Sequence, residues 1–373
     1  GAIGAIIDDP AFEQEGAVLV PNVMEALQDL ARWQRLNWEV PVIGITGSNG
    51  KTTTKELIAA VLQTTYKTHF TQGNLNNHIG VPLTILNAPK DMEIAIIEMG
   101  ANHPGEIAFL SEIAQPRYGL ITNIGKAHLE GFGGFEGVIK TKTELYRHLE
   151  DILGHIFIHS DDSLLMSHLP KVPHMDYGSK SDAHVQYEIS PGTATCEVNI
   201  NGHHIQSNLV GAYNASNLAA AWCIGEFFEV EESKMVEALS NYNPSNNRSQ
   251  VVKTSHNTVI LDAYNANPSS VEAAIREFQQ AKHPNGLLIL GDMFELGPYE
   301  AEEHQRMVDL VGKESQAIWV GKAFKACKHH EGQLSFESTE ELIKYLEEHP
   351  VQDHTVLIKG SRGMALERIQ HLL

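Results

Sequence analysis

The sequence predicts an α/β protein built on mostly parallel sheets. Apolar runs that read as buried strands alternate with stretches whose apolar residues recur at helical spacing. The alternation begins near residue 41, changes character between residues 183 and 210, and restarts after residue 250. The chain has 373 residues, and a single core stops growing at about 250 residues. We therefore expect more than one folded unit.

The elements follow one another in a definite order. The first 40 residues hold the strand-like "GAVLV" and the helical pattern "VMEALQDLARWQR", and Pro41 closes them. Buried strands are expected at 42–46, 93–100 and 118–125. The pair Asn201-Gly202 is typical of a type I′ hairpin, which predicts a small antiparallel region. Pro, Asn and Ser cluster near residues 243–246, where we expect a domain boundary. The predicted domains are 1–40, 41–243 and 244–373.

Composition excludes several classes of function. The formal net charge of -20 argues against a nucleic-acid partner, because phosphate backbones are bound by basic surfaces. No apolar stretch reaches the roughly 20 residues that span a bilayer, and the N-terminus has no secretory signal pattern. The three cysteines have no metal-site spacing, which fits a reducing compartment. We expect a cytoplasmic monomer with no membrane insertion.

A glycine-rich turn follows the first buried strand, in "GITGSNGKTTTKELIAAVL". Backbone N–H groups of such a turn, at the start of a helix, can surround a polyphosphate. Lys51 would reach the terminal phosphates and the Thr52 hydroxyl a magnesium ion. The spacing is one residue shorter than the usual phosphate-binding loop, and the alternative is a tight turn with a solvated lysine. The sequence therefore predicts a P-loop ATPase-type central domain.

Two chemically active side chains follow the next strands. Glu98 ends the "IAII" run, and His128 lies just beyond the third strand. Ligands collect at the carboxyl ends of strands in open α/β sheets, so both side chains would face the crevice that holds Lys51. A carboxylate there can hold Mg²⁺. A loop histidine taken alone more often faces solvent, and the position of His128 beyond a strand end makes a ligand role comparable with that alternative.

The second alternating series predicts a Rossmann-like α/β domain. Its strand ends carry these polar residues: Asp262, Asp292, Glu295, Lys359 and Arg362. Protein kinases are excluded because the His-Arg-Asp and Asp-Phe-Gly motifs are absent, and switch GTPases because Asn-Lys-x-Asp is absent. Two facing sets of strand-end loops suit an enzyme that activates one substrate with ATP and delivers another to it. That arrangement favours a ligase.

The chain resembles the Mur ligases from about residue 42 to its end. The resemblance lies, in order, in "TGSNGKTTTKE", "GNLNNHIGVPLTIL", "IEMGANHPGEIA", "NIGKAHLEGFGG", "GAYNASNLAAA", "NNRSQV", "LDAYNANPSS", "GDMFELG" and "IKGSRGMALERI". Within the family it favours the members that use ATP and Mg²⁺ to add D-alanyl-D-alanine to UDP-N-acetylmuramoyl-tripeptide through an acyl phosphate, in peptidoglycan synthesis. Two alternatives stay open. One is a ligase like folylpolyglutamate synthase, and the other is a nucleotide-binding module without ligase activity.

The resemblance implies a role for each matching position. The residues implied to bind ATP are Gly47, Ser48, Asn49, Gly50, Lys51, Thr52, Thr53, Asn76, Asn77, Asn214, Asn217, Arg248, Asp262, Tyr264, Asn265 and Asn267. Those implied to bind magnesium are Thr52, Glu98, His128 and Lys142, and those implied in catalysis are Lys51, Glu98, His128, Lys142 and Arg248. Lys359, Ser361 and Arg362 are candidates for holding the carboxylate of the dipeptide.

Lys142 is also singled out by periodicity. In "GVIKTKTELYRHLE" the apolar residues form one helical stripe, and Lys142 lies within it while Lys140 falls on another face. An inward-facing lysine tends to lose its proton, and a neutral amine can take up carbon dioxide. The resemblance implies a carbamylated lysine at this position. The alternative is a lysine that extends to solvent from a core helix.

The resemblance also raises an expectation about the N-terminus. Such ligases open with a domain that holds the UDP end of the substrate, and residues 1–40 match only something like its tail and linker. We expect that the ATP site is kept and that the UDP-linked tripeptide binds poorly. Calorimetric titration with that nucleotide, beside a full-length relative, measures this, and equal affinities would contradict the expectation.

Overall fold

The computed structural model describes residues 3–190, 195–244 and 250–373, and its strands fall into three sheets. A short parallel pair holds β1 (Ala5–Ile7) and β2 (Ala17–Leu19). The large sheet has the order β11-β10-β9-β8-β7-β6-β3-β5-β4, and the third has the order β12-β13-β17-β14-β15-β16. These sheets confirm the mixed α/β fold that the sequence predicts.

The large sheet is built from the central part of the chain. Its strands are β3 (Val42–Thr46), β4 (Thr68–Phe70), β5 (Ile94–Glu98), β6 (Tyr118–Ile121), β7 (His155–His159), β8 (His174–Gly178), β9 (Val185–Ile189), β10 (Glu197–Ile200) and β11 (His203–Gln206). Pairing is parallel from β4 to β9 and antiparallel from β9 to β11. Asn201 and Gly202 both have positive φ between β10 and β11, which confirms the predicted hairpin.

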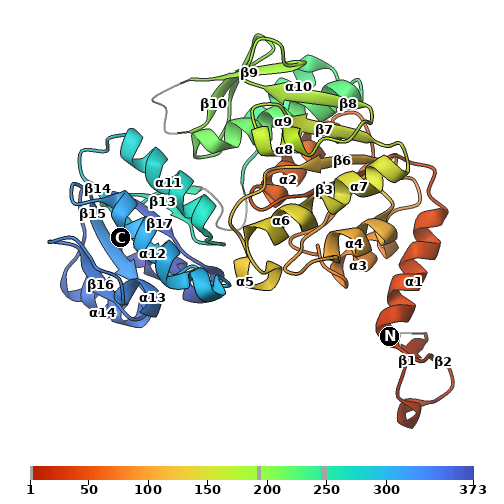
Figure 1. The fold of residues 1–373 in the computed structure, drawn as a ribbon, viewed down its shortest axis with the longest axis horizontal. Coiled ribbons are helices and arrows are strands. Elements are labelled where there is room, and N and C mark those ends of the chain that lie inside the picture. The colour runs from red at the N-terminus through yellow and green to blue at the C-terminus, as the bar shows by residue number, and fades with distance from the viewer. Residues whose placement is uncertain (1–2, 191–194, 245–249) are drawn as a thin grey trace.

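Helices cover both faces of this sheet (Figure 1). The helices of the N-terminal and central parts are α1 (Val23–Leu36), α2 (Lys51–Leu62), α3 (Gly80–Leu86), α4 (Glu106–Ala114), α5 (Leu129–Phe132), α6 (Phe135–Lys142), α7 (Glu144–Asp151), α8 (Ser163–Ser167), α9 (Ala215–Phe227) and α10 (Glu232–Asn241). α2, α9 and α10 pack together on one face, and α3, α4 and α7 pack on the other. The buried strands are consequently apolar on both sides, as parallel strands between two helical layers usually are.

The helical stripe expected in residues 137–150 falls on two helices in the structure. α6 ends at Lys142 and α7 begins at Glu144, so that Thr143 lies between them. The Thr143 hydroxyl donates to the carbonyls of Ile139 at 2.8 Å and Lys140 at 3.2 Å. Such a side chain competes with the backbone ladder and favours a break. The apolar stripe of the two helices is nevertheless buried, as its periodicity predicts.

The C-terminal part forms the third sheet and its helices. The elements are β12 (Gln250–Lys253), β13 (Thr258–Asp262), α11 (Pro268–Gln280), β14 (Gly286–Gly291), α12 (Glu300–Val311), β15 (Gln316–Val320), α13 (Lys322–Lys325), β16 (Leu334–Phe336), α14 (Thr339–Glu348) and β17 (Thr355–Lys359). Pairing is parallel except at the β12 edge. Five 3₁₀ turns lie among the described residues, at Pro10–Phe12, Ala212–Asn214, Gly297–Tyr299, Arg362–Met364 and Leu366–Leu372.

We propose that the chain divides into an N-terminal segment 1–40, a central unit 41–243 and a C-terminal unit 244–373. The separation of the strands into three sheets supports this division. In Figure 1 the C-terminal unit, in blue, lies beside the central unit, with α5 close to α12. The loops that follow β3, β5 and β6 line one pocket together with Ser269 and Ser270 at the start of α11.

Candidate active site

The strand order of the large sheet places a ligand-binding crevice at its centre. β3 is flanked by β5 on one side and β6 on the other, so the chain leaves β3 where the strand order reverses. In open α/β sheets ligands bind outside the carboxyl ends of the strands at such a point. A pocket of about 730 Å³ lies there, and residues of the C-terminal unit close its other side.

The loop between β3 and α2 has the conformation that a phosphate-binding loop requires. Gly50 precedes α2 with φ +78°, and no side chain caps the N–H groups of the first helical turn. Those N–H groups and the positive end of the helix dipole therefore remain for an anion. The Lys51 ammonium donates to the carbonyls of Gly47 at 2.8 Å and Ser48 at 3.3 Å, along its own loop.

The segment after β6 braces this loop. The backbone N–H of Asn49 donates to Asn123 Oδ1 at 3.0 Å, and the Thr122 hydroxyl donates to the Asn49 carbonyl at 2.6 Å. Ser48 Oγ exchanges hydrogen bonds with the backbone of Gly125 at 2.9 and 3.0 Å. The loop is thus held in place by the next strand of the sheet before any ligand binds.

Replacement of Gly47 by alanine tests this bracing. Gly47 has φ +145°, and a Cβ there would lie 2.0 Å from Thr122 Oγ1. We expect Gly47→Ala to cost about 1–3 kcal/mol of unfolding free energy and to weaken the binding of a non-hydrolysable ATP analogue in calorimetry. Gly332→Ala is the control, since Gly332 has φ +85° but its Cβ would meet nothing within 4 Å. If both variants lose the same unfolding free energy, backbone strain alone explains the effect of Gly47→Ala, and the contact with Thr122 does not contribute.

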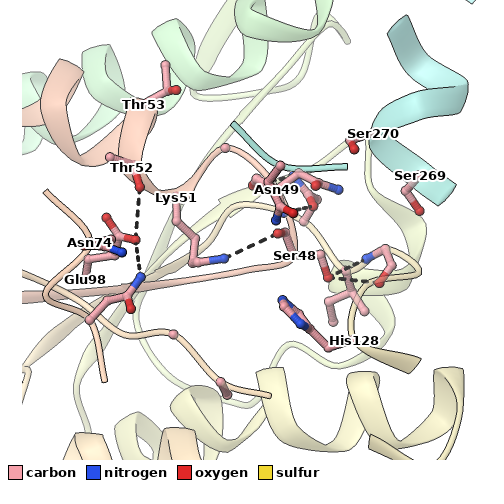
Figure 2. A pocket seen from close by; sticks show the side chains of 18 of the residues that line it. Ser48, Asn49, Lys51, Thr52, Thr53, Asn74, Glu98, His128, Ser269 and Ser270 are labelled. Atoms are coloured by element: carbon pink, nitrogen blue, oxygen red, sulfur yellow. Dashed lines mark hydrogen bonds between the residues drawn. The ribbon is translucent and has the colours of Figure 1, made fainter. Parts of the chain in front are cut away.

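Glu98 lies at the end of β5 and is fully buried. Its Oε1 accepts hydrogen bonds from the Thr52 hydroxyl at 3.1 Å and from Asn76 Nδ2 at 2.8 Å, while its Oε2 has no hydrogen-bond donor in the described structure. Figure 2 shows Thr52 and Glu98 joined across the pocket floor, with His128 on the opposite side of Lys51. This oxygen accepts no hydrogen bond from the residues that the structure describes, although the Lys55 ammonium lies 3.6 Å away as its ion-pair partner, so a lone pair remains to ligate a metal cation.

The fit to magnesium follows from these donors. Within the residues that the structure describes, no group of three or more His, Cys, Asp or Glu side chains could hold a metal. Mg²⁺ is usually bound through one or two carboxylates, with phosphate oxygens and water completing its shell. Glu98 and the Thr52 hydroxyl beside a phosphate loop therefore fit Mg²⁺ bound together with a nucleotide.

Lys55 is a buried residue of the site that sequence reasoning missed. Its Nζ lies 3.6 Å from Glu98 Oε2 and donates to the carbonyl of Gly73 at 3.2 Å. It therefore ties α2 to the end of β5 and to the loop that carries Asn76. The signal was present in the sequence, because Lys55 follows Thr52 by three residues and shares its helix face.

Lys142 lies in the protein interior, with 1% of its surface exposed. Burial lowers the pKa of Lys142 well below its usual value, and the nearby charge of Lys51 lowers it further. Its ammonium nitrogen lies 5.5 Å from the centre of the Phe132 ring. Lys140, in contrast, is exposed. Lys142 is not among the residues that line the pocket, so its role as a metal ligand stays a prediction.

Most of the predicted site residues surround this one pocket. Those that line it are Ser48, Asn49, Gly50, Lys51, Thr52, Thr53, Asn76, Asn77, Glu98, His128, Asn214, Asn217, Asp262, Tyr264, Asn265 and Lys359. The pocket lining also includes Asn74, Asn102, His103, Glu106 and Ser269, which sequence reasoning did not select. Arg248 lies outside the described residues.

Asn214 and Asn217 brace the start of α2. Asn217 Nδ2 donates to Asn214 Oδ1 at 2.9 Å, and Asn217 Oδ1 accepts from the Thr54 hydroxyl at 3.0 Å. On the C-terminal side, Asn267 Nδ2 donates to Asn49 Oδ1 at 2.7 Å, which links the two units at the phosphate loop. The nucleotide contacts predicted for these asparagines stay predictions.

The three candidates for binding the dipeptide have different environments. Lys359 is buried and forms an ion pair with Asp262 at 2.6 Å, so its charge is already neutralised. Ser361 is buried, and its Oγ accepts from the backbone N–H of Phe294 at 3.1 Å. The Arg362 side chain is 62% exposed and pairs with Glu367 at 2.9 Å. Neither Ser361 nor Arg362 lines the pocket.

Fold and site together define a nucleotide-binding α/β protein whose phosphate loop faces a second α/β unit. The Mur ligase middle domain matches residues 45–225, and the Mur ligase glutamate ligase domain matches residues 247–362. The chain belongs to the Mur ligase family, which confirms the resemblance drawn from the motifs.

Several individual members of the family are similar to this chain in sequence or structure. The chain is 35% identical over 372 residues to UDP-N-acetylmuramoyl-tripeptide–D-alanyl-D-alanine ligase of Bacillus subtilis, with 96% of this chain and 81% of that protein covered. Crystal structures of MurF from Acinetobacter baumannii (TM-score 0.85, 29% identity, coverage 98% and 83%) and of MurF from Thermotoga maritima in complex with ADP (TM-score 0.87, 26% identity, coverage 100% and 88%) share its fold. Folylpolyglutamate synthase of Mycobacterium tuberculosis, with 14% identity, a TM-score of 0.67 and 94% of each chain covered, shares the fold alone.

Proposed function

We propose that this protein is an ATP-dependent ligase that joins D-alanyl-D-alanine to UDP-N-acetylmuramoyl-tripeptide and so acts in peptidoglycan precursor synthesis. The observation that carries the proposal is one pocket in which a phosphate loop, a buried carboxylate and residues of a second α/β unit meet. Similarity over 96% of the chain to the Bacillus subtilis ligase supports this choice of substrates.

The residues divide the chemistry between them. Lys51 and the N–H groups at the start of α2 hold the phosphates of ATP and offset their charge. The tripeptide carboxylate attacks the γ-phosphorus, the bond to ADP breaks, and an acyl phosphate forms. The amine of D-alanyl-D-alanine then attacks the acyl carbon, loses a proton, and expels phosphate to leave an amide. Thr52, Glu98 and His128 would hold magnesium ions around the phosphates, and these ions would supply charge neutralisation when bound.

The C-terminal unit has a separate task in this scheme. An acyl phosphate hydrolyses in open water, so the pocket has to be closed during the reaction. Ser269 and Asn265 line the pocket from the C-terminal side, and Asn267 is bonded to the phosphate loop. Residues of this unit are therefore placed to exclude water from the phosphate loop.

The test is an assay of ADP release with each substrate omitted in turn. We expect release to require both UDP-N-acetylmuramoyl-tripeptide and D-alanyl-D-alanine, with one amide product by mass spectrometry, and to be lost in Lys51→Ala. The Bacillus subtilis ligase serves as the positive control. Turnover with a folate and glutamate would favour the folylpolyglutamate-synthase alternative. Nucleotide binding without turnover, beside an active control, would favour a binding module.

A change at Arg362 is expected to act on one substrate. Arg362 follows β17 by three residues, and a guanidinium fork suits a carboxylate. We expect Arg362→Ala to raise the KM for D-alanyl-D-alanine about 10- to 100-fold, the range of a lost charged hydrogen bond, with little change in the KM for ATP. Arg368→Ala is the control, because Arg368 is also exposed and paired, with Glu340. If Arg362→Ala raised the KM for ATP as much as the KM for D-alanyl-D-alanine, this role would be contradicted.

We also propose that the protein acts as a monomer in the cytoplasm. Cys196, Cys223 and Cys327 are all free thiols, which suits a reducing compartment. In the part of the chain that the structure describes, no helix has the length and apolar character needed to cross a bilayer. Sedimentation equilibrium measures the oligomeric state, and a dimer at micromolar concentration would overturn the monomer.

A further inference from the structure

The segment that carries His128 is in contact with the C-terminal unit at several points. The backbone N–H of Lys126 donates to Ser269 Oγ at 2.8 Å, and its ammonium pairs with Glu303 Oε1 at 2.5 Å. Two residues after His128, the N–H of Glu130 donates to the carbonyl of Glu295 at 3.1 Å. In Figure 1 the short helix α5 lies directly beside the C-terminal unit. The loop after β6 is therefore part of the interface between the two units.

Within this interface, one contact involves a residue of the active site. The imidazole Nδ1 of His128 is hydrogen-bonded to Glu295 Oε2. Both residues have left-handed backbone conformations, with φ +53° for His128 and φ +61° for Glu295. Residues other than glycine rarely adopt this backbone conformation. It persists where the surrounding structure enforces it, most often at functional sites. Two such residues facing each other across the interface point to a specific role.

We propose that Glu295 is a positioning residue that acts through His128. A neutral imidazole donates from one ring nitrogen and accepts or binds metal with the other. When the Glu295 carboxylate accepts the proton of Nδ1, Nε2 remains as the nitrogen with a lone pair. Histidines that bind metals are commonly oriented by a carboxylate in this way. The inference rests on the proposed function, in which His128 contributes to the magnesium site.

This arrangement couples the site to the position of the C-terminal unit. His128 belongs to the central unit and lines the pocket, whereas Glu295 follows β14 in the C-terminal unit. The histidine is therefore oriented only when the two units are in contact. Glu295 would make magnesium-dependent nucleotide binding responsive to closure without touching the nucleotide itself.

The experiment is calorimetric titration of this chain with a non-hydrolysable ATP analogue over a series of MgCl₂ concentrations. We expect Glu295→Gln to raise the Mg²⁺ concentration needed for half-maximal affinity about 10- to 100-fold, the usual effect of removing a carboxylate that orients a metal ligand. The matched control is Glu302→Gln, which removes an exposed carboxylate from the first turn of α12. Thermal unfolding midpoints of both variants are expected to equal that of the parent protein.

A double-mutant cycle separates positioning from an independent effect. If Glu295 acts through His128, the double variant His128→Ala, Glu295→Gln will need no more Mg²⁺ than His128→Ala alone. Additive increases would overturn the inference, as would a Glu295→Gln titration that matches Glu302→Gln. If binding to the parent protein does not respond to Mg²⁺, the proposed function itself fails. If binding to the parent protein does respond to Mg²⁺ and the Glu295→Gln variant has the same Mg²⁺ dependence, only the inference about Glu295 fails.

Discussion

Replacing Lys142 by alanine is expected to abolish ligation, with a loss of at least about 100-fold in kcat, the size of effect seen when a group that stabilises developing charge is removed. Lys142 is almost fully buried, and burial together with Lys51 lowers its pKa well below the usual range. The lowered pKa favours the neutral amine, which can attack carbon dioxide to give an N–C bond, a released proton and an anionic carbamate. A carbamate beside Lys51 and a magnesium ion would be attracted where an ammonium would be repelled.

Chemical rescue tests the carbamate directly. We expect a short-chain carboxylic acid to restore part of the activity of Lys142→Ala, because it supplies the two oxygens that the carbamate would carry. Bicarbonate is not expected to restore it, since the variant has no amine to modify. Lys140→Ala is the matched control, because Lys140 is exposed two residues away in α6. Loss of activity in Lys140→Ala with an active Lys142→Ala would show that the inward-facing lysine has no part in the reaction.

Features that depend on a local sequence pattern could be predicted from the sequence alone. The strands β3, β5 and β6 are continuous apolar runs, and a glycine-rich turn directly after the first of them predicted the phosphate loop. Helical period alone distinguished Lys142 from Lys140. The Asn201-Gly202 pair specified its hairpin because few other residues adopt two successive positive φ angles.

Contacts between distant segments could not be predicted in this way. His128 and Glu295 are 167 residues apart, and their hydrogen bond depends on how the two units meet. Lys359 was selected as a group that holds a substrate carboxylate, yet it is paired with Asp262 on the neighbouring strand β13. The break at Thr143 depends on the hydrogen bonds that one hydroxyl makes. In each case the tertiary environment, and not the residue type, decides which partner a polar side chain has.

Lys55 likewise pairs with a residue distant in sequence, Glu98. Replacing Lys55 is expected to lower the stability of the fold substantially. Lys55 and Glu98 are both fully buried, with Nζ and Oε2 3.6 Å apart. Lys55→Met keeps much of the side-chain volume but leaves the Glu98 carboxylate without its cation. Removing one partner of a buried ion pair costs about 3–5 kcal/mol, because the remaining charge is uncompensated. We expect a loss of this size in the unfolding free energy measured in urea.

The double variant Lys55→Met, Glu98→Gln distinguishes the charge from the packing. Glutamine keeps an acceptor for the Thr52 hydroxyl but carries no charge that needs a partner. We therefore expect the double variant to recover most of the lost unfolding free energy. It is not expected to recover ligation, since the carboxylate that suits Mg²⁺ is gone. A double variant as unstable as Lys55→Met would show that the lysine stabilises the fold through its packed side chain, and that Glu98 does not depend on it for a counter-charge.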